Sequence, residues 1–315
     1  MTATPTTALV TCMRNEGANL IEWIAYNQVI GFGPIVVLTN DCTDGSDELL
    51  ARLDTLGEVI HVNHTPAKGQ KPQFAGLRIA EGLDAVRSSD WVLVQDADEY
   101  LTVTAGAGTV GDLITAAGAD ADAIALFWRF FGTAGHDTWQ GEHILPTRTR
   151  THGEPARRLI GHKTLFRPDR FDHFHPHMPK GPRGDVSARN TAGVDLPTRG
   201  FAILDRVRYQ CGMERCTFEN GWLAHHALKA AEVYRTKKYR GFGGQPLENR
   251  FEVGGEVYRA FDRNEVENTD ILRMWPETRA RIDALLQDAE TRRLHEHCQS
   301  WFQMEIARVA MLERV

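Results

Sequence analysis

The chain has 315 residues, with 36 Lys and Arg against 42 Asp and Glu, so its formal net charge is −6 when the 13 His are neutral. Hydrophobic residues make up 42% and charged residues 25% of the chain, close to the averages for soluble globular domains, which excludes a disordered protein. The mildly acidic balance argues against a general nucleic-acid binder, for which a basic surface is expected.

Cysteine usage and apolar run lengths bear on the location of the protein. The five Cys form no Cys-x-x-Cys pair, which favours a reducing compartment. The N-terminus lacks the basic and apolar regions of a secretory signal, and apolar runs such as residues 123–127 are far shorter than the ~20 residues that span a bilayer. We therefore expect a cytoplasmic protein without a transmembrane segment.

Apolar periodicity predicts alternating strands and helices over the first part of the chain. We expect strands at 8–12, 34–39, 58–62, 91–95 and 123–128, and helices at 20–30, 47–56 and about 70–88. Such a series predicts an α/β fold with a mostly parallel central sheet flanked by helices. Ligands bind these sheets at the carboxyl ends of the strands, so the loops after residues 12, 39 and 95 are the first candidates for a site.

The pattern weakens between residues 132 and 200, where Gly, Pro, His and Arg predominate, as in a functional or a disordered loop. Residues 227–240 look helical and basic, and residues 276–315 read as one or two amphipathic helices. The best candidate boundary lies in 246–261, so we expect a main domain at 1–245 and a helical extension at 246–315. Apolar residues of that extension would pack on the sheet domain or, alternatively, contact a membrane peripherally.

The strongest chemical signal is a run of carboxylates directly after the strand at 91–95. Asp96 and Asp98 lie two residues apart, so an extended backbone points both to the same side, and Glu99 follows. Burying several like charges is costly unless a cation neutralises them. Carboxylate oxygens suit Mg²⁺ or Mn²⁺, and the alternative is a solvated acidic turn.

Two further loops follow predicted strands. Asn40, Asp41 and Asp44 offer short polar side chains that could hydrogen-bond a base or a ribose. Arg14 could meet a phosphate and Glu16 a ribose or base. In both loops the alternative is ordinary turn and helix-cap chemistry.

Histidine and basic residues gather in the middle of the chain. His173, His175 and His177 alternate and would share one side of an extended segment. The segment could lie near phosphates or an acceptor, or be a merely exposed loop. A zinc site is a third interpretation, but no fourth ligand is evident. The basic residues suit phosphate binding and include Arg148, Arg150, Arg157, Arg158, Lys163 and Arg167. Lys237, Lys238 and Arg240 would close over a nucleotide or lie on a solvated helix face.

Several motifs in order along residues 8–242 resemble family-2-type glycosyltransferases. They are Arg-Asn-Glu at 14–16 with Glu-Trp-Ile at 22–24, Asn-Asp-Cys-Thr-Asp-Gly-Ser at 40–46, Asp-Trp at 90–91 with Asp-Ala-Asp-Glu-Tyr at 96–100, Phe-Gly-Thr-Ala-Gly-His at 131–136, Lys-x-x-x-Arg-Pro at 163–168, and Ala-His-His at 224–226 with Lys-x-x-Arg-Gly at 237–241. The subgroup that the chain resembles has Lys-Asn-Glu and Glu-Trp-Ile motifs near its N-terminus, and Arg14 stands here in place of the usual Lys.

This resemblance implies a glycosyltransferase A-type nucleotide-binding fold over residues 1–245. Its activity would be a metal-dependent, inverting transfer of a hexosyl group from a nucleotide-diphosphate sugar, with a UDP-sugar favoured, to a saccharide or glycoconjugate acceptor in bacterial-type polysaccharide synthesis. Mn²⁺ or Mg²⁺ would be held by Asp96, Asp98 and one His, either His225 or His226. The expected nucleotide and phosphate contacts are Arg14, Glu16, Asn40, Asp41, Asp44, Gln73 and Lys163.

Asp137 and Glu99 are the two candidates for the general base that deprotonates the acceptor hydroxyl. Two other functions remain open from sequence. One is a sugar nucleotidyltransferase, which would normally carry a Gly-rich phosphate loop with Lys near the N-terminus. The other is a non-catalytic nucleotide-sugar-binding protein, which would not need the intact carboxylates at 96 and 98.

Overall fold

The structure is a computed structural model that describes residues 5–155, 161–240 and 251–313. Of the expectations above, the basic residues Arg157 and Arg158 and the boundary between 245 and 246 lie outside the described residues, as does the side chain of Arg240.

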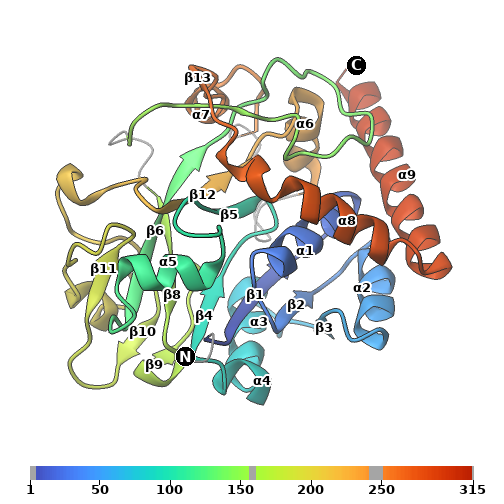
Figure 1. Ribbon diagram of the computed structural model, residues 1–315. Coiled ribbons are helices and arrows are strands. Elements are labelled where there is room, and N and C mark those ends of the chain that lie inside the picture. The colour runs from blue at the N-terminus through green and yellow to red at the C-terminus, as the bar shows by residue number, and fades with distance from the viewer. Residues whose placement is uncertain (1–4, 156–160, 241–250, 314–315) are drawn as a thin grey trace.

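A mixed sheet forms the centre of the protein, and in the described residues it has nine strands (Figure 1). Eight of them follow the order β3-β2-β1-β4-β8-β6-β12-β5, and β11 pairs with β6. Their bounds are β1 (Thr7–Met13), β2 (Ile35–Thr39), β3 (Ile60–Asn63), β4 (Trp91–Val94), β5 (Glu99–Val103), β6 (Ala123–Phe130), β8 (His162–Phe166), β11 (Ala188–Asn190) and β12 (Gly221–His225). Of these, β8 and β5 run against the others, so the expected mostly parallel sheet is confirmed.

Helices cover both faces of the sheet. On one face lie α1 (Leu20–Val29), α2 (Ser46–Thr55), α5 (Val110–Ala117), α8 (Trp275–Leu285) and α9 (Ala289–Leu312), and on the other lie α3 (Pro72–Glu81) and α4 (Asp84–Arg87). Successive strand residues alternate between the two cores: Leu93 packs with the first group, Val92 and Val94 with the second. Because both faces are buried, these strands read as unbroken apolar runs in the sequence.

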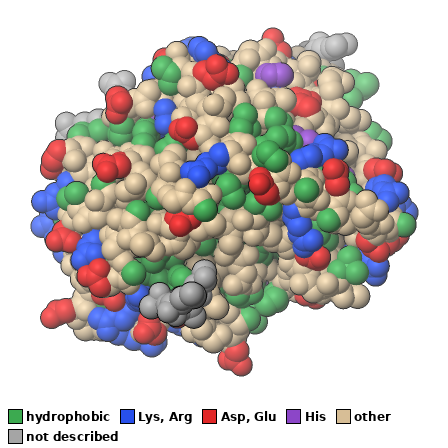
Figure 2. Space-filling view, viewed as in Figure 1, with side chains coloured by type: hydrophobic (Ala, Val, Ile, Leu, Met, Phe, Trp, Pro, Cys, Tyr) green, Lys and Arg blue, Asp and Glu red, His purple; other side chains and the backbone are tan. Residues whose placement is uncertain are grey.

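Smaller elements complete the described chain. They are β7 (Arg150–Thr151), β9 (Phe171–His173), β10 (Lys180–Pro182), α6 (Ala231–Arg240), α7 (Glu256–Phe261) and β13 (Val266–Glu267). On the face shown in Figure 2, acidic and basic side chains are interspersed and apolar ones form small groups.

The helix expected at about 70–88 is two helices, because Leu83 between them has an extended backbone with φ −82° and ψ 124°. The sequence analysis missed β5 and α5. The carboxylates at 96–99 masked the start of β5. A capping box begins α5. The Thr109 hydroxyl accepts a hydrogen bond from the Asp112 backbone N–H, and the Asp112 carboxylate accepts one from the Thr109 N–H.

The C-terminal region is helical, as expected, and it packs against α2 and the loops after β1 and β2. Arg52 of α2 makes two hydrogen bonds to Asp288, which caps α9. A Cβ added at Gly17 would lie 2.6 Å from Cys298 Sγ, so α9 closely approaches the turn after β1. Among the described residues no helix is long and apolar enough to span a membrane.

The contact between α3 and β1 generates a test of packing. A Cβ at Gly76 would lie 2.7 Å from Cys12 Sγ, while the next atom, His64 Cε1, is 3.3 Å away. Overpacking of this kind typically costs about 1–3 kcal/mol, more than the roughly 1 kcal/mol that Ala gains over Gly in a helix. We expect Gly76→Ala to lower the free energy of unfolding in urea, and Gly76→Ala/Cys12→Ala to recover most of the loss.

The control is Cys12→Ala alone, which separates the loss of the thiol from the relief of the clash. Additive effects of the two substitutions would show that the Cys12 thiol does not limit the approach of α3 to β1.

Candidate functional site

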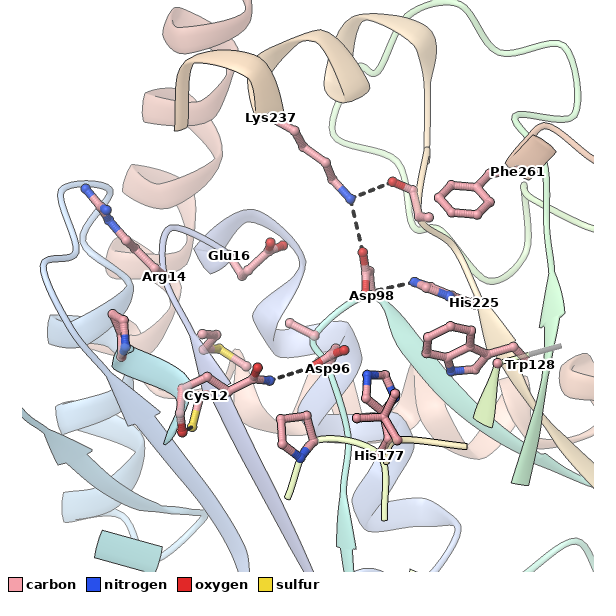
Figure 3. Close-up of a pocket in the computed structure, with 18 of the residues that line it drawn as sticks. Cys12, Arg14, Glu16, Asp96, Asp98, Trp128, His177, His225, Lys237 and Phe261 are labelled. Atoms are coloured by element: carbon pink, nitrogen blue, oxygen red, sulfur yellow. Dashed lines mark hydrogen bonds and ion pairs between the residues drawn. The ribbon is translucent and has the colours of Figure 1, made fainter. Parts of the chain in front are cut away.

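A cavity of about 920 Å³ opens at the carboxyl ends of β1, β2 and β4, as expected for a parallel sheet. Figure 3 shows Arg14 and Glu16 on one side of it, Trp128 and Phe261 on the other, and Asp96 and Asp98 between them. The predicted residues that the structure brings together here are Arg14, Glu16, Asn40, Asp41, Gln73, Asp96, Asp98 and His225.

The loops after β1 and β2 hold each other in place. Asn15 and Asp41 both have left-handed backbones, with φ 54° and 49°. The Asn15 side chain accepts from the Thr43 N–H at 2.8 Å and donates to the Thr43 hydroxyl at 3.0 Å, and Arg14 Nε donates to the Asp41 carbonyl at 3.1 Å. Strained backbone of this kind is typical of ligand-binding loops.

Asp44 links these two loops through hydrogen bonds of its buried side chain. Its carboxylate accepts from the Gly17 N–H at 2.9 Å and from the backbone and hydroxyl of Ser46 at 3.0 and 2.6 Å. The side chain is buried and does not line the cavity, and its hydrogen bonds fix the shape of the two loops.

Lys163 neutralises the first carboxylates. Its Nζ, fully buried in β8, lies 2.8 Å from Asp96 Oδ2 and 3.7 Å from Glu99 Oε2. Burial raises the pKa of Glu99, and Lys163 offsets part of that shift. Burial also lowers the pKa of Lys163, but Asp96 and Glu99 outweigh it and leave that pKa above its usual value. The lysine therefore stays charged and fixes the start of β5.

A second lysine neutralises Asp98. Lys237 Nζ, from α6, lies 3.1 Å from Asp98 Oδ2 and also donates to the Ala227 carbonyl at 2.6 Å (Figure 3). On the other oxygen, Oδ1, His225 Nε2 lies 3.4 Å away. Burial alone would raise the pKa of Asp98, but Lys237 and His225 hold it well below its usual range. Of the lysines predicted to close over a nucleotide, Lys237 therefore lies in the cavity, whereas Lys238 lies 3.9 Å from Glu313.

The two adjacent histidines have different surroundings. His225 lines the cavity, with its ring centroid 4.8 Å from that of Trp128 and 5.0 Å from that of Phe130. His226 points into the core, where its ring stacks on Phe131 at 4.8 Å, and burial lowers its pKa to about 3. Alternation along β12 separates the two side chains, so His225 is the one beside Asp98.

The two candidates for a general base lie away from the cavity. Glu99 is completely buried and accepts from the Asp96 backbone N–H at 3.0 Å. Asp137 is exposed, and its backbone carbonyl accepts from the Glu232 N–H at 3.1 Å at the start of α6. The structure therefore places neither carboxylate in the lining of the cavity.

Sequence reasoning missed the aromatic wall of the cavity. Trp128 and Phe130 lie two apart on β6 and therefore share one face of the strand, and Phe261 of α7 stacks on Phe130 with centroids 4.7 Å apart. The spacing of Trp128 and Phe130 was a usable signal, because both lie at the carboxyl end of β6, after the apolar run at 123–127.

The cavity holds two groups that could bind the expected metal. Among the described residues, no group of three or more His, Cys, Asp and Glu could hold an ion alone. Asp98 and His225 nevertheless present a carboxylate and an imidazole nitrogen side by side in the cavity. This pair fits Mg²⁺ or Mn²⁺, which takes one or two protein ligands and completes its shell with phosphate oxygens and water.

Comparisons with known proteins give fold-level similarity alone. No family model and no curated protein matches the chain. Similar solved structures include S. aureus TarS 1-349, at 12% identity and a TM-score of 0.35 over 98% of this chain and 91% of that one. The same TarS segment in complex with UDP is 13% identical, with a TM-score of 0.34 and the same coverage. A third structure, of S. aureus TarS, is 13% identical with a TM-score of 0.35, and the match covers 96% of this chain and 54% of that one. At these scores the similarity carries no argument about function.

The Lys163 cluster generates a stability prediction. Removing one partner of a buried ion pair leaves an uncompensated charge and typically costs about 3–5 kcal/mol. We expect Lys163→Met to lower the free energy of unfolding by about that amount in urea. Adding Glu99→Gln should restore part of it, because one buried carboxylate is then removed.

Lys238→Met, which removes only an exposed ion pair, is the matched control and should change stability by about 1 kcal/mol or less. A Lys163→Met protein as stable as wild type would contradict the role assigned to this lysine.

The two histidines give an opposed pair of predictions. Neither ring nitrogen of His226 has a hydrogen-bond partner in the described residues, so His226→Phe removes two unsatisfied polar atoms and keeps the stacking. We expect this variant to melt at or above the wild-type temperature.

His225→Phe should leave the melting temperature within a few degrees but weaken Mn²⁺-dependent binding of UDP about tenfold or more, measured by calorimetry. The reverse pattern would assign the ligand role to His226.

Proposed function

We propose that this protein is a metal-dependent glycosyltransferase that uses a nucleotide-diphosphate sugar. The observation that carries the proposal is the position of Asp98, at the carboxyl end of β4, with an ammonium on one oxygen and an imidazole on the other. An acidic group held between an ammonium and an imidazole in a cavity at strand ends suits a ligand that brings both phosphates and a metal.

The nucleoside would occupy the side of the cavity formed by the loops after β1 and β2. Asn40 and Asp41 supply amide and carboxylate groups for a base or ribose, and Gln73 reaches in from α3, where it donates to Asp96 Oδ1 at 3.2 Å. Glu16 lies beside Lys229 at 3.2 Å, which keeps its carboxylate oriented. UDP is the favoured nucleotide, and Arg14, which lines the cavity, would meet its phosphates.

Asp98 and His225 would hold Mn²⁺ or Mg²⁺, with Asp96 within the same cavity. When bound, the metal would neutralise the diphosphate as it leaves the sugar. Lys237 supplies a further positive charge at the same place, on the flexible stem of a side chain that can turn from Asp98 toward a phosphate oxygen.

The finer assignment follows the sequence resemblance. The transferred group would be a hexosyl residue, the reaction would invert the anomeric configuration, and the acceptor would be a saccharide or glycoconjugate of a bacterial-type polysaccharide pathway. The protein would work in the cytoplasm, in peripheral contact with the membrane that carries such acceptors.

Nucleotide binding tests the proposal. UDP should bind in the presence of Mn²⁺ and bind about tenfold more weakly, or about 1.4 kcal/mol, in Asp98→Asn or in EDTA. Titration calorimetry on both proteins with and without Mn²⁺ measures all four conditions. Asp169→Asn, an exposed carboxylate outside the cavity, is the control and should match wild type.

Equal affinity in all four conditions would overturn the metal–diphosphate assignment. Release of UDP from UDP-glucose, UDP-galactose or UDP-N-acetylglucosamine would separate an enzyme from a binding protein. Formation of UDP-sugar from UTP and a sugar phosphate would instead identify a nucleotidyltransferase.

A further inference from the structure

One wall of the cavity is lined by aromatic and imidazole rings. His162, His175 and His177 form it together with Trp128 and Phe74. The centroid distances are 5.6 Å between Trp128 and His177 and 5.3 Å between Phe74 and His175. Aromatic faces and neutral imidazoles suit the C–H groups and hydroxyls of a sugar ring, whereas phosphates call for cations.

The hydrogen bonds of these histidines fix which ring nitrogens carry protons. His177 Nδ1 lies 3.2 Å from the His162 carbonyl, and since a carbonyl can only accept, Nδ1 is the protonated nitrogen. The second nitrogen of His177, Nε2, is therefore an unprotonated acceptor. Burial and the nearby Lys163 lower the pKa of His177 to about 4, which keeps the ring neutral at pH 7.

His175 has the opposite tautomer. Its Nδ1 accepts from the His177 backbone N–H at 3.4 Å, so its proton is on Nε2, which acts as a donor. His162 has the same tautomer as His177, because its Nδ1 lies 3.4 Å from the Lys163 carbonyl, but its Nε2 is buried and offers no acceptor to a ligand. One wall of the cavity thus offers a donor on His175 and an acceptor on His177, the pattern that hydroxyl groups of a saccharide satisfy.

We propose that this wall is the acceptor subsite and that His177 is the general base of the transfer. The inference rests on the proposed glycosyltransferase function and names the residues that serve its second substrate. Asp96 and His177 line the same part of the cavity (Figure 3), which brings the wall next to the expected position of the donor diphosphate.

The step balances as a single displacement. The acceptor hydroxyl oxygen forms a bond to the anomeric carbon while the bond from that carbon to the diphosphate oxygen breaks, and the electron pair leaves with the diphosphate. The hydroxyl proton moves to His177 Nε2 and passes afterwards to solvent. The charge of Asp96 favours the imidazolium electrostatically, because it offsets part of the lowering of the His177 pKa by burial and Lys163.

The test compares His177→Gln and His175→Gln with the wild type. UDP release is measured from UDP-glucose, UDP-galactose and UDP-N-acetylglucosamine with Mn²⁺, with water alone and with p-nitrophenyl glycosides as acceptors. We expect His177→Gln to lower kcat by about 10²–10³, the usual range for a general base, with the Kd for UDP within about twofold. His175→Gln should mainly raise the KM for the glycoside.

His173→Gln is the matched control, since His173 lies in the same segment but is exposed and hydrogen-bonded to Arg78. UDP release by His177→Gln at the wild-type rate would overturn the proposal while leaving the glycosyltransferase function intact. Failure of the wild type to bind UDP with Mn²⁺ would instead be the failure of the proposed function.

A second measurement keeps the proposal falsifiable if none of these donors turns over. Long-range ¹H–¹⁵N spectra of the histidine rings at pH 7 report the tautomers directly. Protonated Nδ1 at His177 and protonated Nε2 at His175 are expected. A proton on Nε2 of His177, or a charged ring there, would remove the base and overturn the assignment.

Discussion

The ammonium group of Lys163 is the constraint on which the site depends. Three carboxylates stand within four residues at the end of β4, and one of them, Glu99, is completely buried. Without a cation inside the sheet, Asp96 and Glu99 would repel each other in a medium of low dielectric. By reaching across from the neighbouring antiparallel strand, Lys163 allows β4 to turn directly into β5 and leaves Asp98 facing the cavity.

The division of labour among the acidic residues follows from this arrangement. Glu99 is used for folding, Asp96 belongs partly to the Lys163 cluster and partly to the cavity, and Asp98 is stabilised by groups that line the cavity itself. The ion pair of Asp98 with Lys237 and its contact with His225 mean that the carboxylate is preorganised before a ligand arrives. A ligand that competes for Asp98 must therefore displace or recruit a cation that is already there.

Much of the fold was predictable because both faces of the sheet are buried. A strand such as β4 carries no polar residue until it ends, so its apolar run and its terminating carboxylates were visible together. The proximity of the loops at 14–17 and 40–45 also followed, since parallel strands end at one edge of a sheet.

What could not be derived was pairing across long sequence distances. The partners of Asp96 and Asp98, at positions 163 and 237, lie on an antiparallel strand and a late helix whose register has no local signature. For the same reason the exposure of Asp137 and the opposite orientations of His225 and His226 required the three-dimensional structure.

The contact of α9 with the turn after β1 has a consequence for the order of synthesis. Cys298 packs against Gly17, and His297 lies against Gly45, so the last long helix contacts the loops after β1 and β2. A growing chain folds from its N-terminus, and these loops leave the ribosome long before the helix is made. The sheet strands can pair early, but the contacts of α9 with Gly17 and Gly45 form only after residue 298 has emerged. Nascent chains that stop short of this helix would thus carry every residue proposed to touch the ligands and still lack its contacts with the two loops.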